Sequence, residues 1–119
     1  MYEIYFYEDK NGNSPVLDFI ETLSQQSDKN SRVNSNKIND FVEALSVYGK
    51  ALGEPHIKNI DGEIWELRPI RNRIFFASWN NDGFILLHHF VKKTRKTPQR
   101  EIDQAKRNLK DMKERGNRL

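Results

Sequence analysis

The strongest candidates for chemistry in this sequence are seven basic side chains, which form two groups. The groups are Arg68, Arg71 and Arg73, followed by Lys92, Lys93, Arg95 and Lys96. Arginine can hold a phosphate through two parallel hydrogen bonds, and lysine offers it a compact point charge. Cations gathered this densely repel one another unless a polyanion pairs with them. The spacing therefore favours a nucleic-acid backbone as the ligand, and the alternative is a solvated rim that contacts nothing specific.

The charge of the chain is divided unevenly between its two halves, although the total is only +3. Residues 1–57 hold 5 Lys and Arg against 9 Asp and Glu, a net −4. Residues 58–119 hold 15 against 8, a net +7. A field concentrated on one part of a surface steers an oppositely charged partner toward it, so the second half should carry the polyanion site.

Metal-based and nucleophilic catalysis have little support in the residue types present. The chain has no cysteine and three histidines, His56, His88 and His89. Consecutive residues of a strand point to opposite faces, so His88 and His89 cannot chelate one metal ion. Neither a glycine-rich phosphate loop nor a serine nucleophile elbow is present. We therefore expect a mechanism that needs no metal and no cofactor.

The sheet that must position the basic groups can be predicted from apolar runs and turn residues. We expect strands over residues 2–7, 64–68, 73–79 and 84–91. The last two form a hairpin that is apolar on both faces, which indicates a sheet covered on both sides. In this meander the end of the last strand lies beside the start of the one before it, so the two basic groups should meet at one end of the sheet. Arg71 and Arg73 would share a face there if the chain is extended.

Helical spacing predicts three helices around this sheet. Ser14 and Pro15 suit the N-cap and first position of the first helix. Residues 24–35 are polar and could be a connection or the frayed start of a second helix, which would end at Gly49 or Gly53. A third helix would begin at Thr97 and Pro98, with residues 115–119 as a frayed tail.

These elements together predict an α+β fold, with a small, mostly antiparallel sheet, two N-terminal helices and a C-terminal helix. A chain of 119 residues suits one domain over residues 1–119. The N-terminus does not resemble a signal peptide, and no run of about 20 apolar residues could span a membrane. We expect a cytoplasmic protein with no membrane association.

Two stretches are similar to a known family at that family's spacing. They are EIWELRP, residues 63–69, followed by RNRI, and HHFVKKTRKTP, residues 88–98. With these motifs the sequence resembles the phage-derived Gp49-like branch of the RelE superfamily, which includes the HigB toxins. The similarity extends over nearly the whole chain.

The resemblance implies a RelE-like microdomain that serves as the toxin of a type II toxin–antitoxin system. Such toxins cleave mRNA in the ribosomal A site, against the 16S rRNA of the 30S subunit, and so inhibit translation and growth. A HigA-type antitoxin with a helix-turn-helix would neutralise the toxin.

The resemblance also assigns roles to the basic residues. It implies Arg68, Arg73, Lys93 and Lys96 as catalytic residues. Further RNA contacts would come from Arg71, Lys92, Arg95 and His88. The family's downstream tyrosine has no counterpart, since residues 97–99 read Thr-Pro-Gln.

The expected reaction is attack of an RNA 2′-hydroxyl on the adjacent phosphorus, which gives a 2′,3′-cyclic phosphate and a free 5′-hydroxyl. Arg68 and Arg73 would stabilise charge on the phosphate oxygens. Lys93 or Lys96, crowded by other cations, would transfer protons. Glu66 and His88 are the other candidates, although Glu66 could simply pair with an arginine and His88 could be a core histidine.

Two alternatives to an enzyme remain open at the level of sequence. The first is a non-catalytic module, a degenerate toxin that binds RNA or an antitoxin and cuts nothing. The second is a structural partner in a phage complex whose basic face touches nucleic acid.

Overall fold

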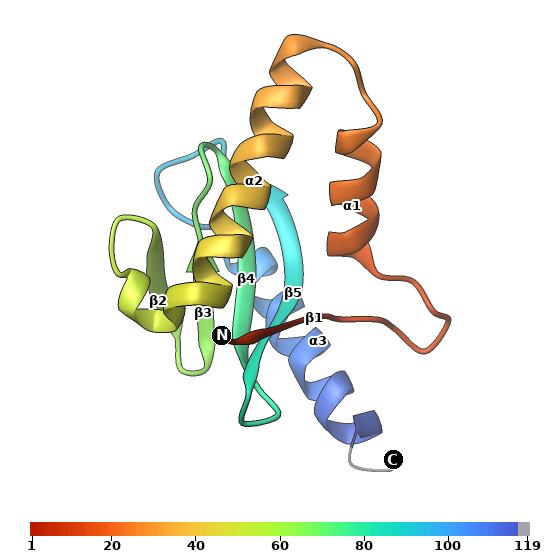
Figure 1. Cartoon of the computed structure of the whole chain (residues 1–119). Helices are drawn as coiled ribbons and strands as arrows, with labels where there is room; N and C mark the ends of the chain where they lie inside the picture. The colour runs from red at the N-terminus through yellow and green to blue at the C-terminus, as the bar shows by residue number, and fades with distance from the viewer. Residues whose placement is uncertain (117–119) are drawn as a thin grey trace.

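A five-stranded sheet lies between two layers of helix in the computed structural model, which describes residues 1–116 (Figure 1). Its spatial order is β1-β5-β4-β3-β2. The strands are β1 (Glu3–Phe6), β2 (Ile57–Asp61), β3 (Ile64–Leu67), β4 (Asn72–Trp79) and β5 (Gly83–Val91). The helices are α1 (Pro15–Ser24), α2 (Lys29–Tyr48), the short 3-10 helix η1 (Gly49–Leu52) and α3 (Gln99–Gly116). The predicted α+β fold, with two N-terminal helices and a C-terminal one, is confirmed.

The sheet is mixed because one of its pairings is parallel. Strands β2 to β5 form an antiparallel meander, as predicted for the last three. The strand β2 was not predicted from sequence. Strand β1 pairs parallel with β5, in the register Glu3 to Gly83. The two backbones approach so closely that a Cβ atom on Gly83 would lie 1.9 Å from the carbonyl oxygen of Glu3, so only glycine fits there.

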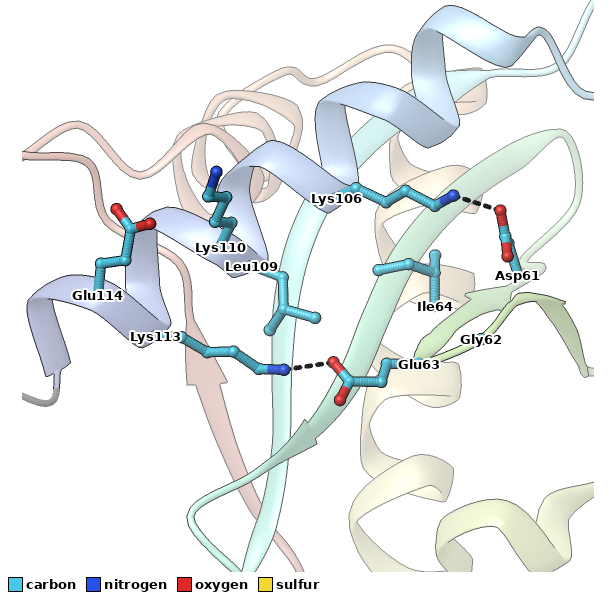
Figure 2. Close-up of a pocket in the computed structure, with 9 residues that line it drawn as sticks. All are labelled: Asp61, Gly62, Glu63, Ile64, Lys106, Leu109, Lys110, Lys113 and Glu114. Carbon is cyan, nitrogen blue, oxygen red and sulfur yellow. Dashed lines mark hydrogen bonds and ion pairs between the residues drawn. The ribbon is translucent and has the colours of Figure 1, made fainter.

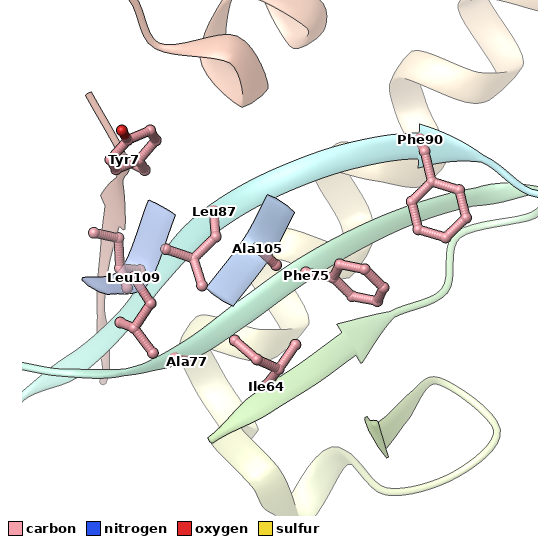
Figure 3. Close-up of a cluster of buried hydrophobic side chains, with 9 residues drawn as sticks. Tyr7, Ile64, Phe75, Ala77, Leu87, Phe90, Ala105 and Leu109 are labelled. Carbon is pink, nitrogen blue, oxygen red and sulfur yellow. The ribbon is translucent and has the colours of Figure 1, made fainter. Parts of the chain in front are cut away.

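Apolar side chains fill both sides of the sheet, as the two-sided hairpin predicted. The cluster beneath α3 includes Phe75, Leu87, Phe90 and Leu109 (Figure 3). The cluster on the other side is covered by α1 and α2. A bulge between Phe75 and Phe76 shifts the register, so that Phe75 faces His88 while Phe76 faces Leu86.

The helix boundaries confirm part of the sequence analysis and correct the rest. Helix α1 begins at Pro15 after Ser14, although the Ser14 hydroxyl donates to the Tyr7 carbonyl at 2.9 Å and caps nothing. Helix α2 already begins at Lys29, because Asp28 accepts a hydrogen bond from the Ser31 amide at 2.9 Å. Of the two alternatives for residues 24–35, the start of the second helix is therefore the correct one from Lys29 onward. Gly49, with φ +58°, ends it.

Helix α3 begins one residue after Pro98 and continues through Arg115 and Gly116. The prediction of a frayed tail is wrong for these two residues, and residues 117–119 lie outside the described part of the chain. Arg115 holds the helix end, since its guanidinium bonds to Asp111 at 3.0 Å and to the Glu8 carbonyl. Asp111 also accepts from the Tyr7 hydroxyl at 2.6 Å. These contacts join the end of α3 to the segment that follows β1.

None of the helices within residues 1–116 is long and apolar enough to cross a membrane.

Candidate active site

The two predicted basic groups meet at one end of the sheet, where β3 and β5 end and β4 begins. The antiparallel register pairs Asn72 with Val91, so the start of β4 lies beside the end of β5. The Lys92 amide then donates to the Arg71 carbonyl at 2.8 Å, which extends the pairing past the strand ends. We call Glu66, Arg68, Arg73, His88 and Lys92, which gather here, the sheet-end cluster.

The cluster is arranged as two rows across the face of the sheet that α3 covers. Strand register places Glu66, Phe75 and His88 side by side in one row. In the next row Arg73 pairs with Phe90, and the pairing of Leu67 with Ile74 brings Arg68 beside Arg73. Diagonal neighbours on a sheet face lie about 7–8 Å apart. His88 is thus one diagonal step from Arg73, within reach of a ligand that Arg73 holds.

Glu66 supplies the negative charge at the centre of the cluster. Its side chain is 1% exposed, and its Oε1 lies 3.3 Å from Nε of Arg68 and 3.8 Å from Nε of Arg73. Neither contact has hydrogen-bond alignment, and Oε2 has no hydrogen-bond partner within residues 1–116. Burial raises the pKa of Glu66, against the lowering effect of Arg73, Arg68 and Lys92. The carboxylate therefore orients the guanidiniums without saturating them.

Arg73 is anchored on the turn that precedes its own strand. Its Nη1 donates to the carbonyl of Ile70 at 2.8 Å and to that of Asn72 at 2.9 Å. Burial lowers the pKa of Arg73 and the charge of Glu66 raises it, but an arginine stays protonated in proteins. The side chain of Arg68 is the more exposed of the two, at 26% against 12%. Arg68 thus has more freedom to meet a ligand, while Arg73 is held in place.

The remaining predicted residues lie around this cluster and not within it. Arg71 is exposed in the turn before β4 and lies outside the extended strand. The expectation that Arg71 and Arg73 share a face of an extended chain therefore does not apply. Lys92, which belongs to the cluster, is half-buried. Lys93, Arg95 and Lys96 are exposed in the segment between β5 and α3, and their side chains form no ion pair or hydrogen bond within residues 1–116.

His88 and His89 point to opposite faces of the sheet, as predicted. His88 Nε2 lies 3.0 Å from Oε1 of Glu101, in the first turn of α3, and the His88 side chain is 17% exposed. His89 stacks on Phe19 with ring centroids 3.5 Å apart. Burial, with a smaller contribution from His88, lowers the pKa of His89 to about 4. His89 is therefore a neutral structural residue, and His88 is the one on the cluster's face.

A network behind the cluster supports the turn over residues 69–72. The side-chain oxygen Oδ1 of Asn72 lies 3.2 Å from Nε2 of His89. The side-chain nitrogen Nδ2 of Asn72 donates a hydrogen bond to Oδ1 of Asn34 at 2.9 Å. The same nitrogen reaches the Pro69 carbonyl at 3.3 Å. Helix α2 and strand β5 thereby fix the residue next to Arg73.

A separate hollow lies at the opposite end of β3. A groove of about 380 Å³ separates α3 from the turn between β2 and β3, over a floor of Ile64 and Leu109 (Figure 2). Ion pairs join its walls, Lys106 to Asp61 and Lys113 to Glu63. Exposed basic side chains, Arg71, Lys93, Arg95 and Lys96, lie around the sheet-end cluster, which suits an extended polyanion better than a small enclosed ligand. Among residues 1–116 no three histidine or acidic side chains are grouped to hold a metal ion.

A family model described as phage-derived protein Gp49-like matches residues 18–110. This range contains strands β2 to β5 and every residue of the sheet-end cluster. The chain belongs to the Gp49-like family. Gp49-like proteins are part of the RelE-like, toxin-like group. No curated protein sequence matches this Gp49-like chain.

Three residues of this Gp49-like site were not identified from sequence: Ile70, Asn72 and Glu101. Asn72 and Ile70 shape the turn that holds Arg73, and the shape of this turn depends on contacts with α2 and β5. Glu101 follows Pro98 in a first helical turn, where acidic residues are common for local reasons. Only the packing of α3 on the sheet shows that it faces His88.

Proposed function

We propose that this Gp49-like protein is the toxin of a type II toxin–antitoxin system, and that it acts as an endoribonuclease on mRNA in the ribosomal A site. The observation that carries the proposal is the pairing of Arg68 and Arg73 around a buried, incompletely bonded Glu66, on the same sheet face as His88. Two preoriented guanidiniums suit the developing charge of phosphoryl transfer. The Gp49-like family match supports the toxin part of the proposal.

In the proposed reaction the 2′-hydroxyl oxygen forms a bond to the adjacent phosphorus, and the bond from phosphorus to the 5′-oxygen breaks. The products are a 2′,3′-cyclic phosphate and a 5′-hydroxyl. Arg68 and Arg73 stabilise the extra negative charge on the non-bridging oxygens. Glu66 is a positioning residue, because a carboxylate that is 1% exposed is screened from the substrate by the arginines it orients.

A base must take the proton of the 2′-hydroxyl, and an acid must return one to the 5′-oxygen. The contact of His88 with Glu101 at 3.0 Å supports His88 as one of these groups, because a carboxylate that holds one ring nitrogen orients the imidazole. Lys93 and Lys96 remain the candidates for the other group, from the exposed segment that follows β5.

The exposed cations around the site support action on an RNA that another body positions. Arg71, Lys93 and Arg95 are exposed around the rim and would contact the backbone of the mRNA or of 16S rRNA in the 30S subunit. Orientation of the substrate by the ribosome could supply much of the rate. For the neutralising partner we propose a HigA-type antitoxin, in a cytoplasmic system that involves no membrane.

The test is to induce the protein in bacterial cells and map the 5′ ends of cellular mRNA. We expect growth arrest and new 5′ ends within translated messages, and we expect Arg73→Ala to lose both while it stays folded by circular dichroism. Lys37→Ala, which removes an exposed lysine of α2, is the matched control and should behave as the wild type. Growth arrest without new 5′ ends would favour the non-catalytic binding module instead.

A further inference from the structure

Ile70 adopts a backbone conformation that its side chain disfavours. Its φ is +60°, in the left-handed region, where a β-branched residue is an outlier. Asparagine and glycine occupy such positions readily, as at Asn80, Asn81 and Gly62 in this chain. An isoleucine kept at this position needs a reason, and strained residues often lie at functional sites.

Contacts within the sheet-end cluster hold Ile70 in this conformation. Its carbonyl accepts from Nη1 of Arg73 at 2.8 Å. The Asn72 amide closes the turn by donating to the Pro69 carbonyl at 3.0 Å. The shape of the turn is thus tied directly to the guanidinium that should meet the phosphate.

The side chain that this turn presents is apolar and exposed. Ile70 is 47% exposed. Arg68, Arg71 and Arg73 flank Ile70 along the chain. An aliphatic group among cations suits a ligand that has an anionic backbone and flat apolar faces, which describes a nucleotide. A protein partner would suit this surface less, because its charge calls for a polyanion.

We propose that Ile70 contacts a nucleobase next to the phosphate held by Arg68 and Arg73, and so determines which sequences are cut. The proposal rests on the proposed nuclease function. It makes Ile70 a specificity-determining residue. The strain at Ile70 is the consequence of placing an apolar side chain at the tip of a turn that Arg73 holds by a hydrogen bond.

The test compares Ile70→Gly, Ile70→Asn and Ile70→Val by mapping 5′ ends after induction and by thermal unfolding of the purified proteins. Glycine and asparagine tolerate the left-handed conformation, so the turn and the arginines stay in place. We expect both to unfold at the wild-type temperature or above it. Cleavage at preferred sites should fall about fivefold, because the base would no longer cover the exposed part of an isoleucine side chain, and the base preference should flatten. Ile70→Val should keep the wild-type pattern.

Val47→Ala is the matched control, since Val47 is 44% exposed on α2 and should not affect the pattern. If the glycine and asparagine variants cut the same sites to the same extent as the wild type, the proposal is wrong, and the exposed isoleucine serves another partner such as a protein. If the wild type itself produces no new 5′ ends, the nuclease function fails first, and the base contact falls with it.

Discussion

Oε1 of Glu66 lies 3.8 Å from Nε of Arg73, across the neighbouring strands β3 and β4. Burial opposes the charge on both partners, because it raises the pKa of the carboxylate and lowers that of the guanidinium. A buried pair of this kind contributes little to stability but fixes the orientation of its members. The opposition between burial and charge at Glu66 and Arg73 can be measured through stability and through cleavage.

Replacing Glu66 by glutamine should change how stability depends on pH. The pKa of Glu66 is raised in the folded state, so its contribution to stability is present below the ordinary value of 4.5 and is lost as pH rises above it. Glu66→Gln cannot ionise and lacks this loss. Unfolding midpoints at pH 4 and pH 7 should therefore show that the stability of the variant relative to the wild type is greater at pH 7 than at pH 4. If the relative stability of the variant is instead lower at pH 7, the arginines lower the pKa of Glu66 by more than burial raises it.

Lysine should replace Arg68 better than it replaces Arg73. Arg73 bonds through Nη1 to two carbonyls of its turn while its Nε lies 3.8 Å from Glu66, and the single ammonium of lysine cannot hold the turn, face Glu66 and meet a phosphate at the same time. Arg68 is more exposed and contributes mainly charge. We expect Arg73→Lys to reduce mRNA cleavage in a translation extract at least tenfold, and Arg68→Lys only a few-fold. Equal losses would argue against the anchoring role of Arg73.

His89 should make the protein sensitive to mild acid. Its folded pKa of about 4 lies below the ordinary 6.5, so its contribution is complete above pH 6.5 and is lost as pH falls toward 4. The shift corresponds to a loss of about 3 kcal/mol. Urea unfolding at pH 7.5 and 4.5 should show this loss in the wild type but not in His89→Phe, which keeps a ring against Phe19.

His56→Asn is the control for that experiment, because it also removes a histidine, but one that is exposed. It should follow the wild type at both pH values. Parallel losses in the wild type and His89→Phe would show that the acid sensitivity arises elsewhere.

The Tyr7 hydroxyl should stabilise the fold without affecting the cluster. It donates to Asp111 at 2.6 Å, and burial together with this bond raises the pKa of Tyr7 to about 12. Tyr7→Phe should lower the free energy of unfolding by about 1–3 kcal/mol, since a hydrogen bond to a charged group is lost. Tyr48→Phe, at a 59% exposed tyrosine, should have no measurable effect. Cleavage by both variants should match the wild type; a selective loss in Tyr7→Phe would link this bond to the site.

Helix-start residues and turn residues in the sequence predicted the boundaries of the elements that they flank. Ser14 and Pro15 marked the start of α1, and turn residues separated β3, β4 and β5 to within one residue at either end. Strand β2 was missed because its pattern is largely exposed, with Ile57 its one fully buried side chain. The first half of α2 was predicted only as an alternative to a connection, because small polar residues, Ser31 and Ser35, occupy its buried face.

The candidate site was predictable as far as strand register determines it. Antiparallel pairing of the strands was enough to expect that the groups around Arg73 and Lys92 would meet. They did not predict that Glu101 would face His88, because that contact depends on how α3 packs on the sheet. The strain at Ile70 was equally hidden, since nothing in its neighbours Pro69 and Arg71 demands a positive φ.

The parallel pairing of β1 with β5 has a consequence for synthesis. Glu3 leaves the ribosome early, but its partner Gly83 is added only after most of the chain has been made. At about 5–20 residues per second this delay is roughly 4–16 s. Glu101, which contacts His88, is added later still. The nascent chain therefore cannot complete its sheet before residue 83, or its cluster before residue 101, has been added, which would delay the activity that we propose until that point of synthesis.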